Sequence, residues 1–156
     1  MIRRDDSRPC DPERRDLIGV GGCFLLAGLA GLPVFSITGL GAANEKQFPL
    51  PQADSVNIDR KAQVILVREH NAVYAFALSC PHENAAVKWL AKDHRFQCSK
   101  HDSKYQPDGV YTAGRATRNL DRFAVRREGE TVVVDLQHWF QSDKDPAGWK
   151  DALIRL

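Results

Sequence analysis

The chain has 156 residues, of which 27% are charged and 43% hydrophobic, so it can form one globular domain with a sizeable core and a short appendage. Its formal charge of +2 comes from scattered side chains, without a long basic run or a basic patch interleaved with aromatic residues, which excludes nucleic acid as an expected partner. Cys10 lies in a charged tail and Cys23 in an apolar run, so only Cys80 and Cys98 remain for the folded part and no disulfide framework is indicated.

The chain begins with a charged tail, residues 1–16, followed by residues 17–43, which contain no charged side chain. A helix needs about 20 apolar residues to cross a bilayer, whereas the apolar region of a signal peptide has only about 7–15. We therefore expect residues 17–43 to form one uncleaved transmembrane helix, although Pro33 and several glycines weaken this prediction. A buried core helix is the alternative, but one of this length without a polar face would be rare in so small a domain.

Five arginines stand in the tail before the apolar run, whereas only Lys46 follows closely behind it. The positive-inside bias therefore places residues 1–16 in the cytoplasm and the folded domain on the periplasmic or outer side of a bacterial-type inner (cytoplasmic) membrane. Residues 14–18 also resemble a twin-arginine export signal, which would suit a protein exported already folded; a plain stop-transfer anchor is the alternative. We expect Cys23 to be a small apolar residue of the helix rather than a lipoprotein cleavage site.

After a short hinge, residues 44–54, the sequence changes to short runs rich in Val, Ile, Phe and Tyr, separated by polar or glycine-containing turns. These runs predict an all-β domain over residues 55–136, folded as a small antiparallel barrel or sandwich, with Gly129 in a hairpin turn. A C-terminal extension, residues 137–156, is predicted to be irregular, with a terminal helix near residues 147–155 and aromatic residues that cover the barrel rather than form a docking patch. The predicted strands are residues 56–58, 64–67, 73–78, 95–98, 123–127 and 131–136.

Two short motifs carry the chemistry: Cys80-Pro81-His82 and Cys98-Ser99-Lys100-His101. Each follows a predicted strand, so we expect the two loops to converge at one tip, where two thiolates and two imidazoles can share a metal centre. This is the ligand set of a Rieske [2Fe–2S] centre, in which cysteines hold one iron and histidines the other. A zinc site also takes two Cys and two His, but the single residue between Cys80 and His82 is awkward for one tetrahedral ion.

The pattern Cys-x-His followed by Cys-x-x-His is the signature of the Rieske family, and residues 98–105, followed by Gly109 and Gly114, resemble the second cluster loop of the iron–sulfur subunit of quinol:cytochrome c oxidoreductases. The resemblance covers about residues 64–127 and implies a cluster-binding subdomain with one [2Fe–2S] cluster, held by Cys80, His82, Cys98 and His101. Neutral imidazoles make such a cluster less negative and raise its potential, to about −150 to +300 mV.

The same resemblance implies roles for two further side chains, Ser103 and Tyr105. In the family, the serine and tyrosine at these places hydrogen-bond a bridging sulfide and a cysteine sulfur. Such bonds stabilise the more negative reduced cluster and raise its potential. An ordinary half-buried core tyrosine is the alternative for Tyr105.

The chain departs from the family pattern at three places. Members of high potential carry a further cysteine in each cluster loop, joined as a disulfide, whereas this chain has Ala85 and Lys100. The leucine common after the first histidine, part of an apolar surface that meets a quinol pocket, is replaced by Glu83, and the proline-rich covering loop is reduced to residues 114–116. These departures leave electron transfer as the expected activity and weaken the case for quinol oxidation.

Two functions follow from the resemblance. The first is an electron-transfer subunit of a respiratory or photosynthetic complex, which takes single electrons from quinol, beside a cytochrome b-like subunit, and hands them to a cytochrome c-type subunit. The second is an accessory relay subunit of another redox complex, such as a molybdenum oxidase. A Rieske oxygenase would need a mononuclear iron site in a further domain, for which we expect no room.

Three more histidines lie in polar, turn-like contexts: His70, His94 and His138. Imidazoles in such places are usually solvated. We expect them to be surface groups rather than metal ligands.

Overall fold

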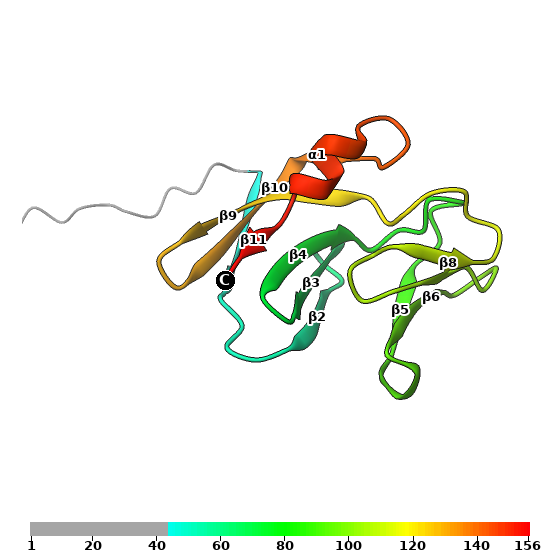
Figure 1. Cartoon of the computed structure of the whole chain (residues 1–156), viewed down its shortest axis with the longest axis horizontal. Helices are drawn as coiled ribbons and strands as arrows, with labels where there is room; N and C mark the ends of the chain where they lie inside the picture. Colours follow the sequence, from blue (N-terminus) through cyan, green and yellow to red (C-terminus); the bar gives the residue numbers. More distant parts are fainter. Residues whose placement is uncertain (1–43) are drawn as a thin grey trace, which may run out of the picture. The chain divides into compact units, whose positions relative to one another are not determined.

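The computed structural model describes residues 44–156, which form antiparallel strands and one short α-helix (Figure 1). The predicted transmembrane helix, residues 17–43, lies outside the described residues. No helix within residues 44–156 has the length and apolar character needed to cross a membrane. The elements are β1 (Glu45–Pro49), β2 (Ser55–Asp59), β3 (Val64–Glu69), β4 (Ala72–Ala77), β5 (Val87–Leu90), the 3-10 turn η1 (Ala91–Asp93), β6 (Arg95–Cys98), β7 (Lys104–Tyr105), β8 (Tyr111–Ala113), β9 (Arg122–Glu128), β10 (Thr131–Phe140), α1 (Pro146–Asp151) and β11 (Ile154–Arg155).

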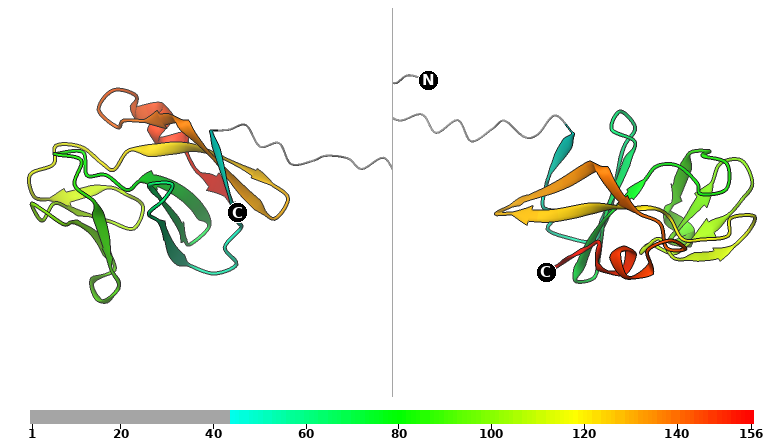
Figure 2. Two further views of the ribbon diagram at one scale, coloured as in Figure 1. Left: turned by 180° about the vertical axis from the view of Figure 1, so that it is seen from behind. Right: turned by 90° about the horizontal axis from the view of Figure 1, so that it is seen from above.

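The larger sheet has seven strands in the order β1-β10-β9-β4-β3-β2, with β11 added beside β4, and its pairs are antiparallel (Figure 2). β9 and β10 form a hairpin whose two-residue turn contains Gly129 at a φ of 58°. A positive φ is what such tight hairpin turns require and what glycine adopts without strain. β4 and β9 meet at a single residue pair, Phe76 with Arg122.

The smaller sheet consists of β5, β6, β7 and β8 in that order, and the figures show it beside β4 and β3 of the larger one (Figures 1 and 2). It carries the loop between β6 and β7. Phe96 on β6 meets Phe76 on β4 edge to face, with ring centroids 6.1 Å apart. This aromatic contact fastens the small sheet to the large one.

Strand β3 explains how two cores arise. Successive side chains of a strand point to opposite faces, and all of Val64–Val67 are buried because both faces are covered. Val64 and Leu66 pack in a core within the larger sheet, with Val132 and Val134 among its members. The other core lies between the two sheets; it contains Ile65, Val67, Phe76, Leu78, Cys80, Val87, Phe96, Cys98, Tyr105, Ala116 and Leu120.

A buried arginine holds the C-terminal segment in place. Arg122 donates from Nη1 to the carbonyl of Trp149 at 2.8 Å and from Nη2 to the carbonyl of Asp108 at 2.7 Å. Its guanidinium also stacks on the Trp149 ring, 3.6 Å from the centroid. Burial lowers the pKa of Arg122 to about 10, so it stays a cation at neutral pH. The side chain therefore joins α1 to the loop between β7 and β8.

All six predicted strands are present, and the prediction of an all-β antiparallel fold is confirmed. The structure adds β1, whose residues Glu45–Pro49 lie inside the segment predicted as a hinge and pair with β10. Pro49 is tolerated there because β1 is an edge strand and its last residue does not need an N–H. Only residues 50–54 then link β1 to β2.

The C-terminal extension is more regular than expected. β10 continues to Phe140 beyond a register shift between Asp135 and Trp139, and α1 is followed by the short strand β11. Trp149 is buried and covers the core, as predicted, whereas Trp139 is 52% exposed. The aromatic residues of this extension therefore divide between core and surface.

Candidate metal centre

The first cluster loop follows β4 and is closed by its own backbone. The N–H of Cys80 donates to the carbonyl of Ala85, and the N–H of Asn84 donates to the carbonyl of Cys80, both at 2.8 Å. Asn84 has a φ of 55°, a left-handed conformation that asparagine tolerates better than most residues. This turn reverses the chain so that His82 stands at its outer end.

The second loop leaves β6 at Cys98 and returns to β7. Cys98 donates its N–H to the carbonyl of Ser103 at 2.8 Å, and Asp102 takes a φ of 54°. The Asp102 carboxylate accepts the Gln97 side-chain amide at 2.7 Å. Ser99 donates its N–H to the carbonyl of Ala86 at 3.0 Å, which links this loop to the end of the first.

The two thiols lie inside the core. Cys80 is fully buried, Cys98 is 1% exposed, and both are unpaired in disulfides. Burial alone would raise the pKa of the Cys98 thiol, but the backbone N–H groups of His101 and Lys100 that point at its sulfur outweigh burial and lower it. A dry pocket with donors aimed at sulfur suits a metal-bound thiolate.

The Tyr105 hydroxyl lies 3.1 Å from Cys80 Sγ, and the residue is fully buried. Burial, followed by the bond to Cys80, raises the pKa of Tyr105. The phenol therefore keeps its proton and can donate it to the sulfur. The contact is the one that the family resemblance implies.

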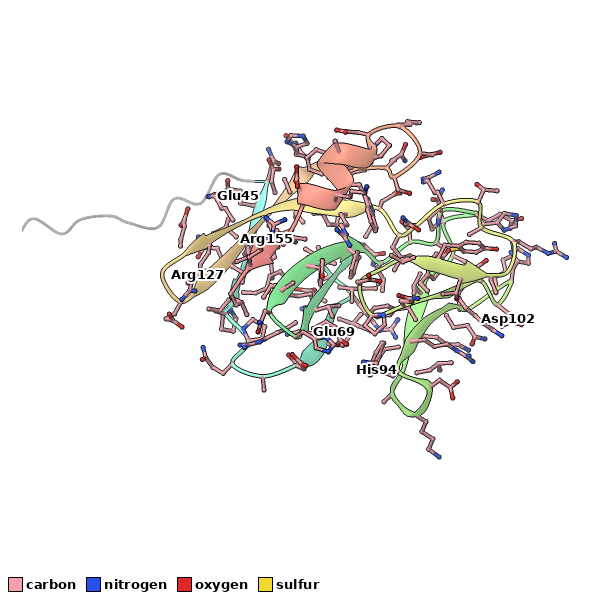
Figure 3. The ribbon with its side chains drawn as sticks, viewed as in Figure 1. Glu45, Glu69, His94, Asp102, Arg127 and Arg155 are labelled. Atoms are coloured by element: carbon pink, nitrogen blue, oxygen red, sulfur yellow. The ribbon has the colours of Figure 1, made fainter. Side chains whose placement is uncertain are left out.

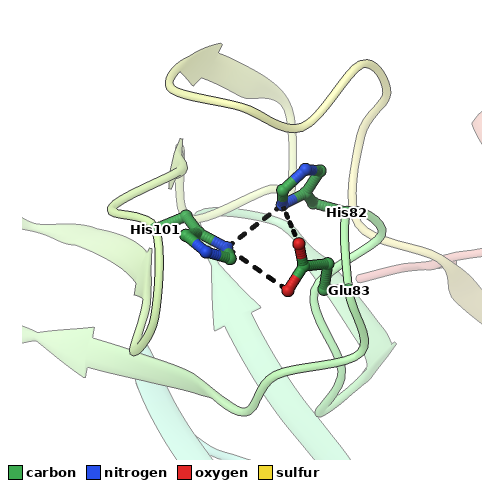
Figure 4. Close-up of side chains that lie close together, drawn as sticks. All are labelled: His82, Glu83 and His101. Carbon is green, nitrogen blue, oxygen red and sulfur yellow. Dashed lines mark hydrogen bonds and ion pairs between the residues drawn. The ribbon is translucent and has the colours of Figure 1, made fainter.

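The two imidazoles face one another at the surface (Figure 4). His82 Nδ1 and His101 Nδ1 are 3.2 Å apart, and the side chains are 26% and 19% exposed. Two nitrogens bound to one metal ion at about 2.1 Å with a tetrahedral angle would be about 3.4 Å apart. The pair thus fits one shared ion, with thiols on the buried side and imidazoles on the solvent side.

An ion pair joins the loops beside the imidazoles. Lys100 Nζ donates to Glu83 Oε2 at 2.6 Å, and the Glu83 oxygens lie 3.9 Å from His82 Nδ1 and 3.8 Å from His101 Nδ1 (Figure 4). The hydrogen bond from Lys100 is the main cause that lowers the pKa of Glu83. The carboxylate at the tip is therefore ionised and already paired within the chain.

Ser103 is fully buried under the segment that follows β8. Its Oγ accepts the backbone N–H groups of Arg115 at 3.1 Å and Ala116 at 3.0 Å. Gly114 has a φ of 110°, and a Cβ there would lie 2.4 Å from Ser103 Cα. Both bonds use the serine oxygen as acceptor, so the hydroxyl can still donate a hydrogen bond.

The structure brings all four sequence-predicted ligand residues to one tip, with Ser103 and Tyr105 beside them. The pairing of Glu83 with Lys100 was not predicted from the sequence, although the opposite charges next to the two histidines were a signal that could have revealed it. The remaining histidines do not join this site. His94 Nε2 lies 3.1 Å and His70 Nδ1 3.4 Å from Glu69 Oε1, away from the tip (Figure 3), and His138 is exposed.

The fold and the tip define a class: a two-sheet antiparallel domain with two buried thiols and two surface imidazoles in facing loops. The family model of the Rieske [2Fe-2S] domain matches residues 41–124, which is more than half of the chain. The chain belongs to this family. The Rieske domain binds a [2Fe–2S] cluster, and the protein is an iron–sulfur electron-transfer protein.

Curated relatives carry the name cytochrome b6-f complex iron-sulfur subunit 1. The protein of Nostoc sp. (strain PCC 7120) is 27% identical over 81 residues, which span 51% of this chain and 44% of the relative. The protein of Synechocystis sp. (strain PCC 6803) is 27% identical over 132 residues, 82% of this chain and 68% of the relative. The match to the first of these thus spans less than half of the relative's length.

A solved structure is also similar: the plasma membrane Rieske protein PetC3 of Synechocystis PCC 6803. It is 23% identical, with a TM-score of 0.43, and the match covers 52% of this chain and 84% of that chain.

Proposed function

We propose that Cys80 and Cys98 bind one iron of the cluster and that His82 and His101 bind the other through Nδ1. The observation that carries the assignment is the 3.2 Å separation of the two Nδ1 atoms above two buried, unpaired thiols. A single zinc ion is the poorer fit, because the thiols lie in the core and the imidazoles stand at the solvent side, which suits a two-iron group with a different ligand pair at each end.

The bound cluster supplies a one-electron acceptor and donor. The chain's own residues set how readily the cluster accepts an electron and at which end of the site electrons are exchanged. Tyr105 can donate a hydrogen bond to Cys80 Sγ, and the buried Ser103 hydroxyl would donate one to a sulfide of the bound cluster, so each bond would strengthen as negative charge gathers on sulfur. His82 and His101 form the exposed end of the site, and partners therefore exchange electrons there.

We further propose that residues 17–43 anchor the protein in a bacterial-type inner membrane, with residues 1–16 in the cytoplasm and the Rieske domain on the outer side. The arginine asymmetry of the sequence supports this orientation. The similar proteins include one named as a plasma membrane Rieske protein and others named as subunits of a b6-f complex. Protease added to intact spheroplasts should degrade the Rieske domain; protection of that domain would contradict the orientation.

The leading function is electron transfer from quinol to a cytochrome c-type acceptor, within a complex that contains a cytochrome b-like subunit. The names of the curated relatives support it. Glu83 stands where the family commonly has a leucine that meets a quinol pocket, which weakens the case for quinol oxidation. Its pairing with Lys100 reduces this difficulty, because a paired carboxylate costs less to bury in a docking pocket than an unpaired one.

One observation favours a second candidate, an accessory relay to another redox subunit. The tip presents a salt bridge whose partners are 59% and 42% exposed, rather than the apolar surface that the family resemblance associates with a quinol pocket. An exposed ion pair suits a polar, transient contact with a protein partner.

The test is purification of the full chain from its own membranes with a mild detergent, followed by assay of quinol-dependent cytochrome reduction. A quinol oxidoreductase should reduce its cytochrome, and the His82→Ala variant should abolish this activity. A complex that holds the cluster and a cytochrome but does not respond to quinol would exclude the leading function and favour the relay.

A further inference from the structure

The two cluster loops are joined by few direct contacts. Among the described residues, one backbone bond, from Ser99 to Ala86, connects the second loop to the end of the first. The closest side-chain bond between the loops outside the four ligand residues is the Lys100–Glu83 pair at 2.6 Å. Each partner stands next to a proposed histidine ligand, so the pair spans the loops at the point where the imidazoles meet.

No disulfide can take over this task. The positions at which the family resemblance implies a disulfide are Ala85 and Lys100, and Cys80 and Cys98 are the only cysteines of residues 44–156. The positive-φ turns at Asn84 and Asp102 shape each loop separately but do not join one to the other. A tip built this way needs another contact to keep the imidazoles together when the loops fluctuate.

We propose that the Glu83–Lys100 ion pair is a non-covalent clasp between the two cluster loops, which keeps the histidine ligands on their iron and slows loss of the cluster. The inference rests on the ligand assignment proposed above. Lys100 is one residue from His101 and Glu83 one residue from His82, so opening the pair frees both loops at their ligands. The lysine also holds the carboxylate near 3.8–3.9 Å from both Nδ1 atoms, which fixes where this negative charge lies.

An exposed ion pair is a weak bond, and the size of the effect follows from that. Loss of such a pair should change a rate by only about 1.4- to 5-fold. The attraction is also screened by salt, with a screening length of about 3 Å at 1 M against about 10 Å at 0.1 M. The clasp therefore predicts a cluster that is lost a few times faster when either partner is removed, and a wild-type protein that becomes more labile in salt.

The experiment measures how fast the full-length holoprotein in detergent loses its visible absorbance in the presence of an iron chelator. Glu83→Gln and Lys100→Met should each lose the cluster about two- to fivefold faster than the wild type at low salt. At about 1 M salt, the wild-type rate should approach theirs. The exchanged double variant, Glu83→Lys with Lys100→Glu, should return to within about twofold of the wild-type rate.

A second readout separates a clasp from a simple effect of charge. The midpoint potential should rise in Glu83→Gln, which removes a negative charge near the imidazoles, and fall in Lys100→Met, which removes a positive one. A clasp therefore predicts shifts of potential in opposite directions but faster cluster loss in both variants. The matched control is Lys88→Met on β5, an exposed lysine that has no ion-pair partner in the described part of the chain.

Several results would overturn the clasp. The first is that one variant retains the cluster longer than the wild type while the other loses it faster. The second is that the single variants match Lys88→Met, and the third is that the double variant loses the cluster at the product of the two single effects. If a single variant takes up no cluster, recovery in the double variant supports the clasp and failure there contradicts it. A wild-type protein without a [2Fe–2S] spectrum would instead refute the ligand assignment itself.

Discussion

The larger sheet and the cluster tip are stabilised in different ways. The larger sheet buries apolar side chains from paired strands, and β3 alone supplies four residues that are at most 2% exposed. The tip has few such side chains; its loops depend on backbone bonds, on residues at positive φ and on the pair Glu83–Lys100. The sheet can therefore form from hydrophobic patterning, whereas the tip depends on specific polar contacts.

The two regions nevertheless share one core. Cys80 and Cys98 pack with Ile65, Val67 and Phe76 of the larger sheet, so the sulfur side of the tip is part of the scaffold. The imidazole side is not, because His82 and His101 belong to no core and remain partly exposed. Disturbing the sulfur side should therefore affect the fold more than disturbing the imidazole side.

The largest expected effect is loss of a ligand. His82→Ala and Cys98→Ala should each abolish the cluster, because each removes one of the four proposed protein ligands, and the purified proteins should be colourless. The larger sheet should stay folded in His82→Ala, as measured by far-ultraviolet circular dichroism, since this side chain lies outside both cores. A normal visible and electron paramagnetic resonance spectrum in His82→Ala would show that the ligand assignment is wrong.

The next largest effect is expected from removing Arg122, the buried cation that joins α1 to the loop between β7 and β8. Arg122→Met leaves the carbonyls of Trp149 and Asp108 without their donors, and an unsatisfied buried group costs about 1–3 kcal/mol. We expect the free energy of unfolding to fall by about 3–5 kcal/mol in denaturant titrations. The exposed Arg60→Met is the control and should change it by less than about 0.5 kcal/mol. Equal stability of the two variants would contradict the role of Arg122.

Two glycines, Gly114 beside the tip and Gly129 in the larger sheet, should respond differently to substitution. Gly114→Ala forces a Cβ to within 2.4 Å of the Ser103 backbone at a φ of 110°, so we expect a loss of about 2–4 kcal/mol and displacement of the segment that covers Ser103. Gly129→Ala also has a positive φ, but no atom lies within 4 Å of the new Cβ, so strain alone should cost about 1 kcal/mol. Thermal unfolding and the visible spectrum of the cluster should be measured for both variants. Equal changes of the spectrum in the two variants would contradict the expectation that only Gly114→Ala disturbs the cluster site.

The same contrast explains what the sequence could predict. Five strands of the larger sheet, β2, β3, β4, β9 and β10, were predictable because their runs are rich in apolar residues, as in residues 64–67, whereas β7 has two residues and β8 three, too few for any pattern. β1 was hidden because prolines and charges made residues 44–54 look like a hinge; its pairing with β10 depends on contacts from far along the chain.

At the tip, residue types in fixed spacing predicted Cys80, His82, Cys98 and His101 as neighbours, because the chemistry of the centre demands those types. The pairing of Glu83 with Lys100 depends on the three-dimensional approach of the two loops, 17 positions apart in sequence, and spacing alone does not specify it. The recruitment of the Arg115 and Ala116 N–H groups by Ser103 is likewise a property of the folded backbone.

A smaller effect is expected from polar contacts to sulfur. Tyr105→Phe removes the hydroxyl that lies 3.1 Å from Cys80 Sγ, and it should leave the cluster bound while lowering its midpoint potential. A bond worth about 1–1.4 kcal/mol more to the reduced state corresponds to about 40–60 mV for one electron. Ser103→Ala should lower the potential as well. An unchanged potential in both variants, measured by redox titration, would show that these hydroxyls do not act on the cluster.

The smallest expected effect on stability comes from an ion pair at the edge of the larger sheet, which takes no part in the cluster site. Arg126 on β9 holds Glu45 on β1 through two bonds, Nη1 to Oε1 at 2.8 Å and Nη2 to Oε2 at 3.0 Å, and so spans the intervening β10. The hydrogen bond from Arg126 lowers the pKa of Glu45 below its usual value of 4.5. A carboxyl whose pKa is lower in the folded state adds stability that is complete above its unfolded-state pKa and lost as the pH falls through the folded-state pKa.

The pH dependence of stability should therefore reveal this pair. The wild type should lose unfolding free energy progressively as the pH falls below about 4.5, and Glu45→Gln should lose less over the same range because its side chain cannot take up a proton. The control is Asp151→Asn, which removes an acid that has no ion pair within residues 44–156 and should leave the slope unchanged. Urea midpoints between about pH 3 and pH 6 measure the three proteins. Parallel curves for the wild type and Glu45→Gln would mean that the pair contributes nothing in solution, and that the edge strand is held by its other contacts, such as its backbone pairing with β10 and the buried Phe48 side chain.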